Sequence, residues 1–109
     1  MSNLMAFYVI FGLLLAILAI PLWNERISPN GLYGFRVRKT MENEKVWYAV
    51  NKYFAPWLAA TGLLTAFAAF SLFHVPGISL AVYSLSVLAV FVMIFILSVQ
   101  MTLRYMNSL

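Results

Sequence analysis

The chain has no cysteine and very little charge. Only 9% of its residues are Asp, Glu, Lys or Arg, whereas soluble domains average about 25%. Without cysteine, disulfides, thiolate nucleophiles and thiolate metal ligands are excluded. So few charges cannot cover a surface that faces water, and 64% of the residues are hydrophobic. The composition therefore predicts a protein that is surrounded mainly by lipid.

Three apolar runs support this prediction, at residues 4–23, 54–73 and 78–103. A helix needs roughly 20 apolar residues to cross a hydrocarbon core of about 30 Å. Each run should be helical, because lipid offers no water to the backbone polar groups. The first run lacks the basic region and cleavage pattern of a removable signal peptide, so it predicts a permanent span. We predict an all-α membrane protein, with residues 1–109 forming a single integral membrane domain.

The three predicted spans contain no Asp, Glu, Lys or Arg. Ion-coupled transporters and proton relays usually place an ionisable group at membrane depth, so this absence argues against both. The only histidine, His74, has no nearby carboxylate and makes a poor metal or acid–base site. There is no His-Glu-x-x-His zinc pattern, glycine-rich phosphate loop or plausible Ser/His/Asp set. We therefore predict a protein that is not an enzyme and has no catalytic residue, metal or cofactor.

The basic residues predict the orientation of the chain in the membrane. With three spans, the connection at residues 24–53 and the C-terminus lie on the same side. That side carries every basic residue of the chain: Arg26, Arg36, Arg38, Lys39, Lys45, Lys52 and Arg104. By the positive-inside rule this side is cytoplasmic, giving a multi-pass plasma-membrane protein with its N-terminus outside and its C-terminus inside. The net charge of +4 then indicates contact with anionic headgroups rather than with nucleic acid.

The charged connection divides into a loop and a helix. Pro29, Asn30 and Gly31 are turn formers and predict a loop. From Thr40, a candidate cap, apolar residues recur at helical spacing as far as Tyr53. This pattern predicts a cytoplasmic amphipathic helix over residues 40–53, which lies at the membrane interface and turns into the second span near Pro56.

The second span carries a stripe of small residues at offsets of four and three. They are Ala55, Ala59, Gly62, Ala66 and Ala69. In lipid, small side chains let helix backbones approach and gain van der Waals contact. The stripe favours packing against the other two spans, with a homo-oligomer seam as the alternative.

The connection also contains an ordered motif of polar, aromatic and small residues. It begins with the run NGLYGFR at residues 30–36 and continues into the following helix. The motif residues are Asn30, Tyr33, Gly34, Arg36, Thr40, Trp47 and Asn51. In these residues the chain resembles the Sdp immunity protein family of small bacterial membrane proteins.

That resemblance implies a protein that protects its host membrane from a secreted antibacterial peptide or protein toxin. It also implies a signalling role, in which the membrane protein holds a cytoplasmic regulator, a transcriptional repressor, when toxin is present. Two other classes stay open from the residues alone: a small transporter or permeation subunit, and an accessory subunit of a larger membrane complex. The motif residues are candidates either for binding a partner or for bracing the fold.

For the bracing role we expect specific contacts. Tyr33 and Phe35 should pack on the cytoplasmic end of the bundle, and Gly34 should permit a sharp bend that a Cβ would block. Arg36 should bond to helix carbonyls, to the acids at the start of the helix, or to Asn51, and so tie the loop to the helix. Trp47 should anchor the amphipathic helix in the headgroup region.

Overall fold

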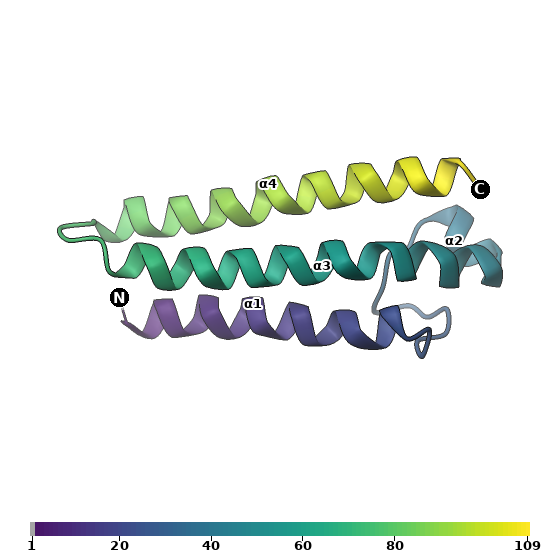
Figure 1. The fold of residues 1–109 in the computed structure, drawn as a ribbon, viewed down its shortest axis with the longest axis horizontal. Helices are drawn as coiled ribbons and strands as arrows, with labels where there is room; N and C mark the ends of the chain where they lie inside the picture. Colours follow the sequence, from purple (N-terminus) through teal and green to yellow (C-terminus); the bar gives the residue numbers. More distant parts are fainter. Residues whose placement is uncertain (1) are drawn as a thin grey trace.

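The computed structural model describes residues 2–109, which form four helices and no strand (Figure 1). The helices are α1 (Ser2–Trp23), α2 (Arg38–Glu42), α3 (Glu44–Phe73) and α4 (Leu80–Asn107). Three of them, α1, α3 and α4, are long and apolar enough to cross a membrane. The prediction of an all-α membrane protein with three spans is confirmed.

The helix α3 is the centre of the molecule, with α1 packed along one side and α4 along the other (Figure 1). The bundle is 51 Å long, which exceeds the roughly 40–45 Å of a bilayer with its headgroups. The N-terminus lies at the same end as the turn between α3 and α4. The C-terminus lies at the opposite end, beside α2 and the long connection (Figure 1).

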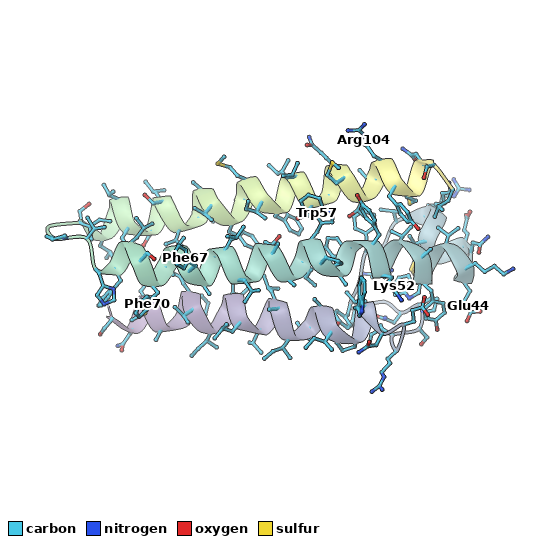
Figure 2. All side chains as sticks on the ribbon, in the orientation of Figure 1. Glu44, Lys52, Trp57, Phe67, Phe70 and Arg104 are labelled. Carbon is cyan, nitrogen blue, oxygen red and sulfur yellow. The ribbon has the colours of Figure 1, made fainter. Side chains whose placement is uncertain are left out.

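Much of the outer surface of the bundle is hydrocarbon. Phe67 is 69% exposed, Met93 70% and Ile17 59%, although large apolar side chains on a soluble protein are mostly buried. Figure 2 shows Phe67 and Phe70 toward one end of α3, whereas the labelled charged residues Glu44, Lys52 and Arg104 lie toward the other. An apolar surface of this kind is stable when acyl chains surround it.

The contact between α1 and α3 is close because two glycines meet at it. A Cβ added to Gly12 would lie 2.3 Å from the carbonyl oxygen of Gly62, and one added to Gly62 would lie 2.2 Å from that of Gly12. Ala66 also lies at this crossing, and Ala55 and Ala69 are buried as well. The small-residue stripe therefore packs within the chain, as the first of its two interpretations predicted.

The helices α3 and α4 are joined by polar contacts inside the bundle. The hydroxyls of Thr61 and Ser98 lie 3.1 Å apart, and the Tyr83 hydroxyl donates to the Ala69 carbonyl at 2.8 Å. Near the C-terminal end the rings of Tyr53 and Tyr105 stack at 4.4 Å. These contacts hold α4 in one register along α3.

The amphipathic interfacial helix that we predicted over residues 40–53 is not confirmed. The chain instead forms the five-residue α2, breaks at Asn43 and begins α3, which continues past Pro56 without a turn (Figure 1). Asn43, and not Thr40, caps this helix, by accepting the N–H groups of Lys45 and Val46. The apolar stripe arises from packing within the protein, because Val50 is fully buried in the core at this end of the bundle.

Candidate functional site

The connection between α1 and α2 folds over the C-terminal end of the bundle as an ordered loop. Asn30 forms its first turn: its side-chain oxygen accepts the N–H groups of Leu32 and Tyr33, both at 2.8 Å. Its amide nitrogen donates to the Ser28 carbonyl at 2.9 Å. An asparagine that bonds to its neighbouring backbone in this way stabilises a turn without help from the rest of the protein. Asn30 therefore acts locally.

Gly34 is the point at which the loop comes closest to α3. Its φ is +115°, a conformation that residues with a Cβ rarely adopt. A Cβ at this position would lie 2.9 Å from the side-chain oxygen of Asn51 and 3.0 Å from the ring of Trp47. Two independent constraints, the backbone conformation and the lack of space, thus require glycine here, as the sequence predicted.

Asn51 and Thr40 hold the backbone just after this bend. Asn51 is buried, accepts the Phe35 N–H at 2.5 Å and donates to the Trp47 carbonyl at 2.9 Å. The Thr40 hydroxyl is fully buried, lies 3.0 Å from the Phe35 carbonyl oxygen and accepts the Val37 N–H at 3.0 Å. Both polar groups of the Phe35 backbone are thereby bonded to side chains from helices, which satisfies them in a dry site.

Trp47 lies inside the protein. Its exposed fraction is 0%, and its indole N–H donates to the Ile27 carbonyl at 2.8 Å. Our prediction that Trp47 anchors a helix among lipid headgroups is therefore wrong. The loop folds over the face of α3 that carries Trp47 and covers the ring, and the sequence alone did not show that this segment returns to α3.

Tyr33 and Phe35 fix the loop to the ends of the spans. The Tyr33 hydroxyl donates a hydrogen bond to the Leu18 carbonyl of α1, and burial raises the pKa of this hydroxyl above its ordinary value. The Phe35 ring is buried and packs on Phe54 of α3 at 5.3 Å. The predicted packing of these aromatic residues on the end of the bundle is found in the structure.

Arg36 departs from the predicted contacts. It is exposed, and among residues 2–109 its side chain forms no hydrogen bond with a helix carbonyl or with Asn51 and no ion pair with the acids at the start of the helix. The acid Glu42 instead pairs with Arg38 at 2.8 Å, an exposed contact that contributes little to stability. Of the seven motif residues, Arg36 is the one whose side chain the loop does not use.

Two further basic residues join the parts of this end of the molecule, although the sequence indicated only their contribution to the charge of this side. Lys39 donates to the Met106 carbonyl at 3.0 Å. Its positive charge is also stabilised there by the negative C-terminal end of the α4 dipole. The ammonium of Lys52 lies 5.0 Å from the ring centroid of Trp23, at the end of α1. Both bring together residues that are far apart in the chain, so no local sequence pattern could have revealed them.

The motif at this end of the bundle presents polar and aromatic groups. Within residues 2–109 no group of His, Asp and Glu is placed to hold a metal ion. The motif supplies a loop that is braced by amides, a hydroxyl and aromatic rings, with the Arg36 guanidinium exposed on its surface. Such a group suits the binding of a carboxylate, a phosphate or a backbone carbonyl.

The fold and the site together define a multi-pass helical membrane protein with a structured polar loop at one end of the bundle. The family model of the SdpI/YfhL protein family matches residues 26–102. This match covers the loop, its motif and most of the two following spans, and the chain belongs to this family. No curated protein and no solved structure matches the chain.

Proposed function

We propose that this chain is a non-enzymatic immunity protein of the plasma membrane, which protects its host cell from a secreted antibacterial toxin. The family match over residues 26–102 supports this function. The single observation that carries the proposal is the state of Arg36: it is exposed and unbonded on a loop whose other motif residues are engaged in bracing. A braced loop that leaves the Arg36 guanidinium exposed suits the recognition of a partner.

The proposal includes an orientation. Two of the seven basic residues lie in the connection between α1 and α2, and two lie in α2. Two more lie in the first part of α3, and one lies in the last part of α4. That places them at the end of the bundle with the loop and the C-terminus (Figure 1). By the positive-inside rule this end faces the cytoplasm and the N-terminus faces outward. The loop is then in position to meet a cytoplasmic regulator, and a toxin would reach it through the membrane.

The decisive experiment is a toxin challenge. Cells of a sensitive bacterium that express the chain, or carry the empty vector, are exposed to the secreted toxin of the founding Sdp system, and survival and membrane potential are measured. We expect the chain to preserve both. Arg36→Gln should abolish protection, whereas Arg38→Gln removes the same charge two residues away and should retain it. Equal survival with and without the chain contradicts the proposal.

The two alternative functions predict different outcomes. A small transporter or permeation subunit would carry substrate across liposomes that contain only this chain, and Arg36→Gln would alter that flux. An accessory subunit would co-purify with a stoichiometric membrane partner and give no protection when expressed alone.

A further inference from the structure

A groove runs along one face of the bundle, between α1 and α4, with α3 as its floor. It contains two hollows. The smaller, of about 190 Å³, is lined by residues that include Phe11, Thr65 and Phe91. The larger, of about 380 Å³, is lined by residues that include Leu18, Leu58 and Val99.

The two hollows lie on the same side of α3, because their lining residues share helix faces. On α3, Leu58 and Thr65 are seven residues apart, and on α1, Phe11 and Leu18 are also seven apart. A spacing of seven residues returns to the same side of a helix. The smaller hollow lies toward the end of the bundle where α1 begins, and the rings of Phe11 and Phe91 meet across it with centroids 5.6 Å apart. The larger hollow lies toward the C-terminal end.

At that end, the groove reaches the braced loop. Residues 32–37 contribute to the larger hollow, and Arg36 is the only charged residue among its lining residues. The smaller hollow is lined by no charged residue. Within residues 2–109 no acid forms an ion pair with this guanidinium, and Glu42 pairs with Arg38 instead.

We propose that this groove binds one anionic phospholipid, with an acyl chain along α3 and the phosphate on Arg36. The order of groups in the groove matches that of the ligand: a cation at the end of the bundle, followed by apolar walls that continue toward its centre. A guanidinium holds a phosphate through paired charge-assisted hydrogen bonds. The larger hollow alone falls within the roughly 300–1,000 Å³ typical of ligand sites.

Charge distinguishes this occupant from a second copy of the chain. All copies insert into the membrane with the same orientation, so two copies packed through the groove would bring their basic ends together. Those ends carry seven Lys and Arg residues against three Glu in each chain, and like charges repel. An anionic lipid neutralises the same surface. This inference uses the same guanidinium as the proposed function, but its test measures lipid binding without toxin, so either can fail separately.

The test uses the purified full chain in nonionic detergent. Phosphatidylglycerol and phosphatidylcholine with identical acyl chains are titrated separately, and bound lipid is measured by native mass spectrometry. Both lipids carry the phosphate, but the choline cation of phosphatidylcholine offsets its charge and weakens its charge-assisted contact with Arg36. We therefore expect phosphatidylglycerol to bind about tenfold more tightly. Arg36→Gln should remove this preference, and Arg38→Gln should preserve it. Equal affinity for the two lipids, or equal losses in the two variants, would overturn the proposal.

A second pair of variants tests the acyl-chain site. Leu18→Trp fills the groove from its α1 wall, and Ile17→Trp adds the same ring to an exposed neighbour that does not line it. Leu18→Trp should weaken the binding of both lipids, while Ile17→Trp should not. If Leu18→Trp loses helicity, Val99→Phe is used in place of that variant, because it narrows the groove from α4. If a variant with a filled groove folds and still binds lipid like the wild type, the proposal is contradicted. It is also contradicted if the wild type forms a dimer without lipid and the groove-filling variant does not.

Discussion

Asn51 of α3 accepts the backbone N–H of Phe35 at 2.5 Å, and the loop is thereby held to the helix by a buried amide. The amide nitrogen of Asn51 donates to the Trp47 carbonyl on its own helix. One side chain thus fixes its own orientation and pairs a loop donor that water does not reach. This arrangement ties the loop to α3 at the end of an apolar bundle.

Asn51→Leu should lower the free energy of unfolding by about 1–3 kcal/mol, because it leaves the buried Phe35 N–H without an acceptor. The measurement is unfolding in SDS, followed by circular dichroism, together with the rate of proteolysis within the loop. Asn107→Leu, at the exposed end of α4, is the control and should change neither. A variant at position 51 that unfolds like the wild type would show that this bond does not hold the loop.

Gly12→Ala and Gly62→Ala should each destabilise the bundle, by about 1–3 kcal/mol or more, because overpacking forces the backbones apart. Each added Cβ would lie 2.2–2.3 Å from a carbonyl oxygen of the opposite helix. Gly31→Ala is the matched control, since a Cβ there meets nothing within 4 Å. SDS unfolding of the three variants compares them. If all three behave alike, the close α1–α3 contact is not a source of stability.

Two glycines with positive φ separate backbone strain from steric overlap. Gly34 has a φ of +115° and a crowded site, whereas Gly77 has a φ of +73° and open space around it. Gly77→Ala should lower the free energy of unfolding only by the penalty of placing alanine in a left-handed conformation, about 1–2 kcal/mol. Gly34→Ala should cost clearly more, since its Cβ would also meet Asn51 and Trp47. Equal losses on thermal unfolding would mean that the loop yields without penalty.

Tyr33 should make the stability of the loop depend on pH. Burial raises its pKa above the ordinary 10.0, so the folded chain keeps the phenol proton to higher pH than the unfolded chain does. The contribution is therefore fully present below pH 10.0 and is lost as the pH rises through the folded pKa. Loop proteolysis should accelerate in that range for the wild type. Tyr33→Phe should lack this additional acceleration, and an identical pH profile in the two proteins contradicts the assignment.

The orientation can be tested directly because the chain has no native cysteine. Cysteines placed singly at positions 36 and 45 should not react with an impermeant maleimide added outside intact cells, and should react after the cells are opened. A cysteine at position 3 should behave in the opposite way. Labelling of positions 36 and 45 from outside would invert the proposed topology and move the loop out of the cytoplasm.

Several features of the site were visible in the sequence and others were not. Gly34 and the aromatic residues beside it were predicted to bend and pack, because the turn residues and the motif are local. The burial of Trp47 and the freedom of Arg36 were not predicted. Aromatic and basic residues near a span commonly lie among headgroups, so composition alone favours the wrong environment for Trp47.

The sequence by itself determined that this is a three-span helical membrane protein, because apolar length and the lack of water for backbone groups leave no other solution. It also determined that the charge lies at one end. Only the tertiary structure decided that residues 44–53 belong to the long helix α3 and that the loop seals Trp47. It also decided that α1 and α4 leave a groove over α3. Those outcomes depend on which faces meet across distant parts of the chain, and local periodicity carries no information about that choice.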